Sequence, residues 1–207
     1  MSDDARAAIL RAVRAARPAP VARPDVRAAV QGFAGDACET PDDRALSARF
    51  AEAARAGGSV VVEGRRGDLP TLVAAAVPGA RRVVSQVDGI VGAVPMPDTP
   101  HGLADADLFV CEAVLGVAEN GAVWLPLSRL GERAAPFIAA HVAVVLDRTA
   151  IVADMHAAYA RLDVAAERFG VFVAGPSKTA DIEQSLVVGA HGPKEFTVVL
   201  IEIAPAP

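Results

Sequence analysis

Two loops carry the residues in this sequence that are best suited to chemistry. The first is Gly116–Trp124, in which Glu119 ends an apolar run directly before Asn120-Gly121. Asn-Gly between two apolar segments is the strongest short signal for a β-hairpin, and in that interpretation Glu119 is a solvated turn residue. The alternative places its carboxylate on a tight loop at the edge of the core, as a general base or nucleophile. Spacing alone favours the hairpin, and Glu119 is kept as the first catalytic candidate.

The second loop, Gly175–Glu183, directly follows the apolar segment Val171–Ala174. Glycine lets main-chain N–H groups approach a ligand, and the loop adds hydroxyl groups and an ammonium group, which together suit a phosphate or a carboxylate. It is not a Walker A motif, because the second glycine and the Gly-Lys-Ser/Thr order are missing. The alternative is a turn that leads into a capped helix start. The candidate ligand-binding residues here are Gly175, Ser177, Lys178, Thr179, Asp181 and Glu183.

A third polar segment, Gly189–Lys194, has two glycines and a proline around His191, which predicts an irregular loop. His191 could bond a ligand or carry a proton, although a single loop histidine is more often exposed and without a function. We take His191 as the second catalytic candidate, and Gly192 and Lys194 as ligand-binding candidates. No metal site is predicted, since no metal-ligand spacing links the other histidines, His101, His141 and His156.

These loops need a framework of helices and strands to position them. The expected helices cover residues 2–16, 40–55, 69–77 and 153–168, with Ser2 and Thr40 as N-caps. The expected apolar strands cover residues 59–63, 81–85, 107–114, 122–125, 139–146, 171–174 and 197–203. Helices that alternate with short, continuous apolar strands indicate an α/β sandwich with a largely parallel sheet. Ligands of such sheets bind outside the carboxyl ends of the strands, so we expect function in the loops that end strands.

The first forty residues are predicted to form a separate arm. Residues 17–24 contain three prolines, which indicates a linker or an extended arm. Thr40-Pro41, followed by two aspartates, marks the start of the next helix. We therefore expect an N-terminal helix with a Pro-rich arm over residues 1–40 and an α/β domain over residues 41–207.

Composition excludes several classes of protein. The chain has 207 residues, of which 53% are hydrophobic and 22% charged, with a net charge of -5, so most of it is not disordered. Without a basic domain or a cluster of aromatic residues, nucleic-acid binding is disfavoured. The longest apolar candidate, residues 134–146, is shorter than the roughly 20 residues of a membrane span. The first residues lack an apolar signal segment, so a cytoplasmic protein is expected.

The cysteines and lysines are few. Cys38 and Cys111 are too few for a metal cluster or a disulfide framework, and Cys111 is predicted to be a buried small thiol. Of the 20 basic residues only Lys178 and Lys194 are lysines, and both lie in the C-terminal loops. A compact ammonium group suits a small carboxylate better than the planar guanidinium of arginine, so Lys178 is the first basic residue to test.

The segments Gly175-Pro-Ser-Lys-Thr-Ala-Asp-Ile-Glu183 and Gly189-Ala-His-Gly-Pro193 resemble the C-terminal signature of the lactate-utilisation protein C family, also called the LUD domain. Residues 116–125 resemble its second motif, which usually has an Ala-Glu-Thr-Gly-Thr core. Here Glu119 and Gly121 match, whereas Asn120 and Ala122 replace the two threonines. The match adds Gly121 to the ligand-binding candidates. Residues 133–142 are also similar to the family, and the whole resemblance covers residues 41–203.

The resemblance implies more than the spacing could show. It implies a three-layer α/β/α fold like that of glucosamine-phosphate deaminases, ribose-phosphate isomerases and CoA transferases. It also implies a part in the oxidation of L-lactate to pyruvate, together with iron–sulfur partner subunits. With two cysteines, this chain does not hold a cluster itself, so we expect a subunit without a cofactor of its own that binds a small carboxylate or phosphate.

Two alternatives stay open. One is a free-standing enzyme that acts on a CoA thioester or a sugar phosphate, with Glu119 as nucleophile or base and Lys178 with the Gly175 loop holding the anion. The other is a binding module in which the N-terminal helix and Pro-rich arm dock a partner.

Overall fold

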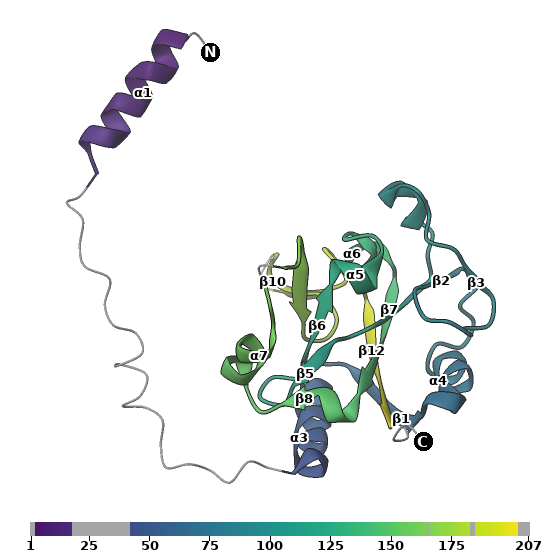
Figure 1. Ribbon diagram of the computed structural model, residues 1–207. Helices are drawn as coiled ribbons and strands as arrows, with labels where there is room; N and C mark the ends of the chain where they lie inside the picture. The colour runs from purple at the N-terminus through teal and green to yellow at the C-terminus, as the bar shows by residue number, and fades with distance from the viewer. Residues whose placement is uncertain (1–2, 18–41, 165, 183–184, 203–207) are drawn as a thin grey trace. The chain divides into compact units, whose positions relative to one another are not determined.

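A computed structural model describes residues 3–17, 42–164, 166–182 and 185–202. The chain divides into two compact units, Met1–Thr40 and Pro41–Pro207. In the first unit, the described residues form the helix α1 (Asp3–Ala15), whose apolar side chains Ile9, Leu10 and Val13 are exposed (Figure 1). None of the described helices is both long and apolar enough to cross a bilayer.

Six parallel strands form the main sheet of the second unit, in the order β1-β12-β7-β4-β2-β3. The central strands are continuous apolar runs because both faces of the sheet are covered. Their bounds are β1 (Val60–Arg65), β2 (Val83–Ser85), β3 (Ala93–Val94), β4 (Leu108–Glu112), β7 (His141–Asp147) and β12 (Glu195–Glu202). This sheet confirms the predicted α/β fold with a largely parallel sheet.

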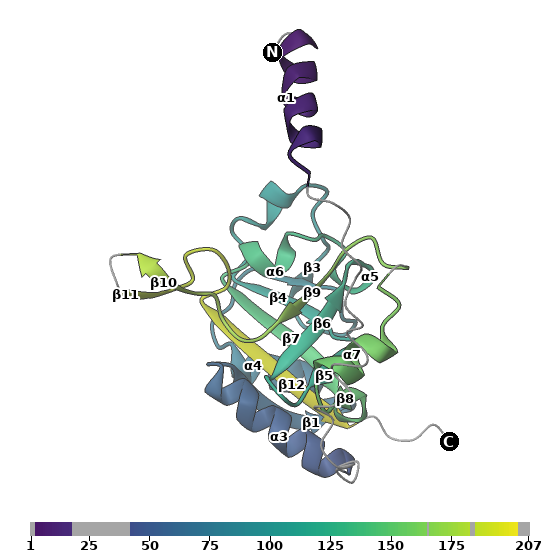
Figure 2. The same ribbon diagram turned by 90° about the vertical axis from the view of Figure 1, so that its left-hand side faces the viewer.

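Helices cover the two faces of this sheet. Successive side chains of a strand point to opposite faces, so Val144 of β7 packs toward α3 (Asp43–Ala56), whereas Val145 packs toward α4 (Leu69–Ala76). Figures 1 and 2 show α4 on one side of the sheet and the strands β5 and β6 on the other. Phe50 of α3 is fully buried, and a side chain of this size contributes about 1.5–3 kcal/mol of burial free energy.

A second sheet lies beside α3 and is mostly antiparallel, in the order β8-β5-β6-β9. Its strands are β5 (Leu115–Val117), β6 (Ala122–Pro126), β8 (Ile151–Val152) and β9 (Gly170–Val173), and α7 (Met155–Arg161) packs on its outer face. The strands predicted over residues 122–125 and 171–174 therefore belong to this second sheet and not to the parallel one. The turn at Asn120-Gly121 folds β6 back along β5, and this antiparallel pair then pairs with β9.

The segment after Gly175 also differs from the prediction. It is neither a loop throughout nor a helix start, because it enters an antiparallel hairpin, β10 (Lys178–Ile182) and β11 (Ser185–Val188), at Lys178. The hairpin projects from the body of the domain (Figure 2). Short helices complete the domain: α5 (Leu127–Leu130), α6 (Ala135–Ile138), η1 (Arg66–Asp68), η2 (Pro100–Leu103) and η3 (Arg148–Ala150).

Two helix boundaries need correction. Asp42 is the N-cap of α3, with its carboxylate 2.6 Å from the amide nitrogen of Ala45, and the predicted caps Thr40 and Ser2 lie outside the described residues. The helix predicted over residues 153–168 ends at Arg161, because Leu162 adopts an extended conformation. Leu162 nevertheless packs against the second sheet, which explains the apolar spacing that continued the predicted helix.

Candidate functional site

The two C-terminal motif loops lie together at the amino edge of the main sheet. The amide nitrogen of Ser177 donates to the carbonyl oxygen of Pro193 at 2.9 Å, and that of Gly189 donates to the carbonyl oxygen of Ser177 at 2.9 Å. Lys194 N–H donates to Ala140 O at 2.8 Å, directly before the first residue of β7. The structure thus joins two segments that the sequence marked separately and anchors them where β7 and β12 begin.

Close approach explains the glycines of these loops. Gly175 has a φ of 84°, and a Cβ atom there would lie 2.6 Å from the carbonyl oxygen of Gly57, the C-cap of α3. A Cβ atom at Gly192 would lie 3.0 Å from Cβ of Ser177. A side chain at either position would push the loops away from α3 or from each other.

Both lysines of the chain lie at the two joined motif loops. Lys178 donates from its ammonium group to the carbonyl oxygen of Gly57, where a cation also balances the partial negative charge of the α3 C-terminus. A Cβ atom at Gly58 would lie 3.2 Å from Lys178 Nζ, so that ammonium lies beside Gly58. Lys194 directly precedes β12, and the methylene groups of its side chain pack over Gly189.

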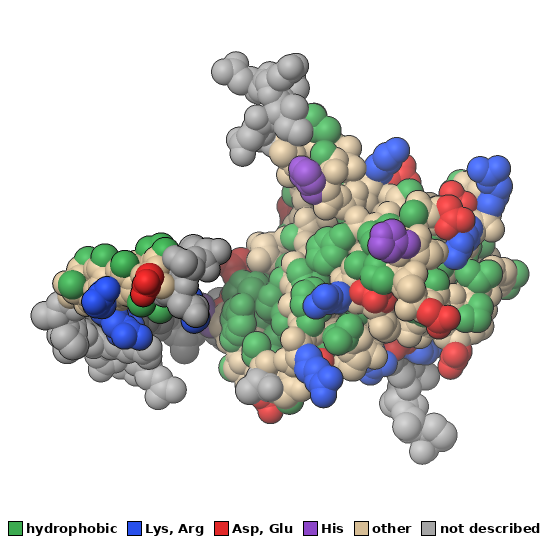
Figure 3. Space-filling view, turned by 90° about the horizontal axis from the view of Figure 1, so that it is seen from above, with side chains coloured by type: hydrophobic (Ala, Val, Ile, Leu, Met, Phe, Trp, Pro, Cys, Tyr) green, Lys and Arg blue, Asp and Glu red, His purple; other side chains and the backbone are tan. Residues whose placement is uncertain are grey.

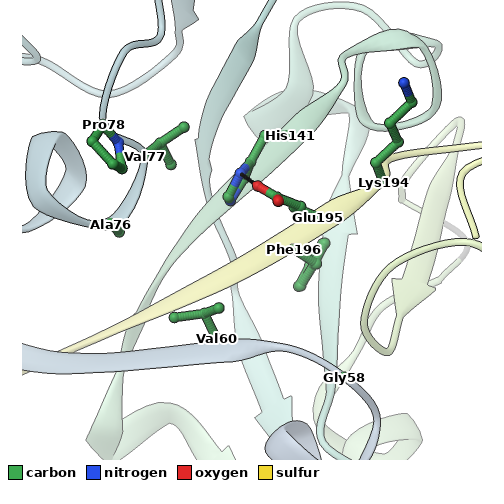
Figure 4. Close-up of a pocket in the computed structure, with 9 residues that line it drawn as sticks. All are labelled: Gly58, Val60, Ala76, Val77, Pro78, His141, Lys194, Glu195 and Phe196. Carbon is green, nitrogen blue, oxygen red and sulfur yellow. Dashed lines mark hydrogen bonds and ion pairs between the residues drawn. The ribbon is translucent and has the colours of Figure 1, made fainter.

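A cavity of about 410 Å³ opens at this edge, between the first residues of three strands and the C-terminal turn of α4 (Figure 4). We call it the amino-edge cavity; it is lined by Gly58, Val60, Ala76, Val77, Pro78, His141, Lys194, Glu195 and Phe196. Its volume falls in the range of about 300–1,000 Å³ that is usual for small-molecule sites. Gly58 and Lys194 connect the cavity with the motif loops.

His141 is the buried polar group of the amino-edge cavity. Its side chain is 6% exposed, with Nδ1 2.8 Å from Glu195 Oε2 and Nε2 2.8 Å from Thr197 Oγ1. Burial lowers the pKa of His141 below its ordinary value, and the neighbouring Glu195 carboxylate opposes this shift in part. A neutral ring donates from Nδ1 to the carboxylate, which only accepts, and receives the hydroxyl proton of Thr197 at Nε2.

The sequence analysis did not connect His141, Glu195 and Thr197. His141 and Glu195 are register partners on neighbouring parallel strands, and 54 residues separate them along the chain, so spacing does not connect them. The one usable signal was polar residues at alternate positions, Glu195 and Thr197, at the start of an apolar strand, with His141 at the start of another. Alternation places Glu195 and Thr197 on one face.

Glu119 lies elsewhere. Residues 117 and 122 pair across the β5–β6 hairpin, and Glu119 Oε2 accepts a hydrogen bond from Met155 N at 3.2 Å, at the first turn of α7. Glu119 is exposed and does not line the amino-edge cavity, so its catalytic role stays a prediction. Gly121 has a φ of 69°, and a Cβ atom there would lie 2.4 Å from Ala54 N, which gives this glycine a packing role on α3.

The other predicted site residues are only partly placed. Thr179 lies in β10 opposite Val187, and His191 is exposed. Asp181 belongs to β10, but its side chain lies outside what the structure describes, as does all of Glu183. The ligand-binding or catalytic roles of these four residues stay predictions.

The carboxyl edge of the main sheet was the expected place for a ligand. Several charged residues there pair with each other: Glu112 with Arg66 and Arg129, and Glu63 with Arg148. A hollow of about 470 Å³ at this edge has walls of mixed charge, formed by Asp43, Arg44, Arg148, Thr149 and Glu202. The C-terminal motif loops are not there because they follow β9 of the second sheet and β11 of the hairpin, and the Glu119 turn follows β5 of the second sheet, so the rule for parallel strands does not govern them.

In the described part of the chain, no group of three or more His, Cys, Asp or Glu residues is placed to hold a metal ion. Cys111 is fully buried in β4, as predicted, and its burial raises the pKa of the thiol.

Figure 3 shows acidic and basic side chains interspersed with apolar ones on the visible face.

Comparison with known proteins defines the family. The LUD domain matches residues 96–201, which is more than half of the chain. The chain belongs to the LUD domain family. The matched segment runs from before β4 to the last but one residue of β12, so it includes His141, Lys194 and Glu195 of the amino-edge cavity.

Individual relatives agree with this assignment. The chain is 29% identical over 102 residues to a lactate utilization protein C of Geobacillus kaustophilus, covering 46% of this chain and 42% of the relative. It is 35% identical over 86 residues to the lactate utilization protein C of Anoxybacillus flavithermus, covering 41% and 39%. The aligned segment spans less than half of the length of these relatives.

A solved structure supports the fold. The crystal structure of a DUF162 family protein from Deinococcus radiodurans superposes with a TM-score of 0.60 at 20% identity, covering 79% of this chain and 99% of that one. At this identity the likeness shows the shared fold alone.

Proposed function

We propose that this LUD-domain chain takes part in lactate utilisation as a component that binds a small carboxylate in the amino-edge cavity. Iron–sulfur partner subunits would carry the electrons of lactate oxidation. The observation that carries the proposal is the similarity to relatives named lactate utilization protein C, at 28–35% identity.

The chemistry of the cavity supports a carboxylate ligand. Lys194 lines it, Lys178 lies beside its wall residue Gly58, and no carboxylate among the described residues pairs with Lys194. Val60 and Phe196 add an apolar wall for the carbon chain of an organic acid. An ammonium group on a flexible stem suits a small anion that enters and leaves.

The assignment of electron transfer to partners rests on cysteine number. Iron–sulfur clusters are usually held by four cysteine thiolates, and this chain contains two cysteines, of which Cys111 is buried. The oxidation of a 2-hydroxy acid releases two electrons that need an acceptor. In this proposal the partners supply it, and the LUD chain supplies binding.

Reconstitution tests the proposal. The purified chain and the iron–sulfur subunits of the host's lactate-oxidising system are assayed apart and together for L-lactate-dependent reduction of a soluble dye. The expected result is no reduction by the chain alone and a rate with both that far exceeds the rate of the partners alone. A partner rate that does not change when the chain is added would contradict the proposal.

The alternative of a free-standing enzyme with Glu119 as nucleophile gains no specific support from the geometry. The carboxylate of Glu119 accepts from the main chain of α7 and lies outside the amino-edge cavity.

A further inference from the structure

The His141–Glu195 pair lies on the wall of more than one hollow. Beside the amino-edge cavity lies a second hollow of about 250 Å³, which Asp107 and Ala140 also line. The two hollows share five wall residues: Val77, Pro78, His141, Lys194 and Glu195. A ligand in either therefore meets the same polar groups.

Glu195 is the side chain of this wall that can accept a hydrogen bond from a ligand. Its side chain is 70% exposed, and only Oε2 is engaged, by Nδ1 of His141. Oε1 is left for a ligand. The other carboxylate nearby, Asp107, lines the second hollow but not the amino-edge cavity, and its Oδ2 accepts from the amide nitrogens of Arg81 and Arg82, each at 2.9 Å.

His141 holds Glu195 and does not meet the ligand with its nitrogens. Both ring nitrogens are occupied, one by Glu195 and the other by Thr197, whose side chain is fully buried. This arrangement fixes the tautomer and the orientation of the ring. The carboxylate of Glu195 is therefore held at one place on the wall instead of swinging freely in solvent.

Lys194 supplies the charge that complements a carboxylate. In Figure 4 its side chain rises at one end of the cavity with the ammonium group directed away from His141. The residue is exposed and its four-carbon stem is flexible, so the ammonium can turn toward an anion at the mouth. One wall thus offers a cation and a fixed hydrogen-bond acceptor.

We propose that the amino-edge cavity recognises 2-hydroxycarboxylates through two residues, with Lys194 contacting the carboxylate and Glu195 accepting a hydrogen bond from the 2-hydroxyl group. This inference rests on the proposed function and makes it more specific. Glu195 is the specificity-determining residue and His141 its positioning residue. A 2-oxo acid or an unsubstituted acid has no hydroxyl proton to donate, which leaves Glu195 without its bond and lowers affinity.

The size of the cavity sets a limit on selectivity. At about 410 Å³ it leaves room beyond a three-carbon acid, and Val60, Val77 and Phe196 form an apolar wall. The head group, and not the length of the carbon chain, is therefore what the site distinguishes.

Isothermal titration of the full chain with L-lactate, pyruvate and propionate tests this inference. The wild-type protein is expected to bind L-lactate at least about tenfold more tightly than the other two acids, as expected for a hydrogen bond to a charged acceptor. Glu195→Ala should bring the three affinities to within about twofold, whereas Lys194→Met should weaken all three together. Glu52→Ala, an exposed carboxylate on α3, is the matched control and should change none of them.

His141 variants separate positioning from folding. His141→Asn keeps an N–H donor near the place of Nδ1 and should retain part of the preference for L-lactate, whereas His141→Ala should lose it. Thermal unfolding of each variant checks that the domain is folded, and the affinity ratio is compared only among folded proteins. If His141→Ala does not fold, Glu195→Ala and Lys194→Met carry the test.

Three results would overturn the inference: equal affinities in the wild type, a preference that survives Glu195→Ala, or no binding of any of the acids at millimolar concentration. They are distinguishable from failure of the proposed function. A chain that restores lactate-dependent dye reduction but binds the three acids equally keeps its function and loses this specificity site.

Discussion

Nδ1 of His141 lies 2.8 Å from Oε2 of Glu195, at the amino edge of a parallel sheet. Because His141 is buried, its pKa is lowered in the folded protein, and the unfolded chain binds more protons just below the ordinary value of about 6.5. The contribution of His141 to the free energy of unfolding is therefore fully present above that pH, and it is lost as the pH falls toward the folded-state pKa.

Urea unfolding at pH 7.5, 6.5 and 5.5 measures this effect. The charged groups that line the hollows with His141 are Glu195, Lys194 and Asp107, and all three are retained in His141→Asn, so the comparison of the two proteins isolates the contribution of His141. The free energy of unfolding of the wild type should fall more steeply with decreasing pH than that of His141→Asn. Parallel slopes would show that His141 does not titrate in the predicted direction.

The two motif glycines that approach α3 should tolerate no side chain. Gly121→Ala and Gly175→Ala place a methyl group against main-chain atoms at positive φ, and each should lower the free energy of unfolding by about 3–5 kcal/mol. Gly79→Ala is the matched control, since its φ is 88° but nothing lies within 4 Å of the added Cβ atom. It should lose only about 1–2 kcal/mol. Equal losses at all three positions would remove the close-approach argument.

Glu119 can be tested for its two interpretations at once. As a hydrogen-bond acceptor at the start of α7, it should lose about 0.5–1 kcal/mol of stability on Glu119→Ala and less on Glu119→Gln, which keeps an acceptor. Asp154→Ala removes the N-cap of the same helix and provides the scale. Lactate-dependent dye reduction that is abolished in folded Glu119→Gln would instead support the catalytic prediction.

Lys178 caps the C-terminus of α3 through the carbonyl oxygen of Gly57, and it also lies beside the cavity. Lys178→Met should lower the stability of the domain by about 0.3–1 kcal/mol through the lost interaction with Gly57, and Lys178→Arg should restore most of it. Chemical unfolding at low and high salt measures both. If Lys178→Met were as stable as the wild type at low salt, the hydrogen bond to Gly57 would contribute nothing measurable.

The sequence predicted the fold class and most strands because their apolar runs are continuous and bounded by turns. Asn120-Gly121 correctly indicated the hairpin that pairs residues 122–125 with the preceding strand. The sequence did not show that this hairpin and residues 171–173 form a second sheet, since a short apolar strand carries no sign of a distant pairing partner. The Gly175–Glu183 loop was predicted because it places a glycine, Gly175, and an ammonium group, Lys178, directly after an apolar strand. His141 and Glu195 were missed, because only the register of β7 against β12 brings them together.

The most direct measurement of the central claim is nuclear magnetic resonance of the histidine side chains during titration with L-lactate. The chain has four histidines, and only His141 lines the amino-edge cavity. The account predicts that the ring signals of His141 shift and saturate with added L-lactate, that those of His101 and His156 stay in place, and that Lys194→Met weakens the response. Saturating shifts that leave His141 unaffected, or the absence of any shift at saturating L-lactate, would contradict it.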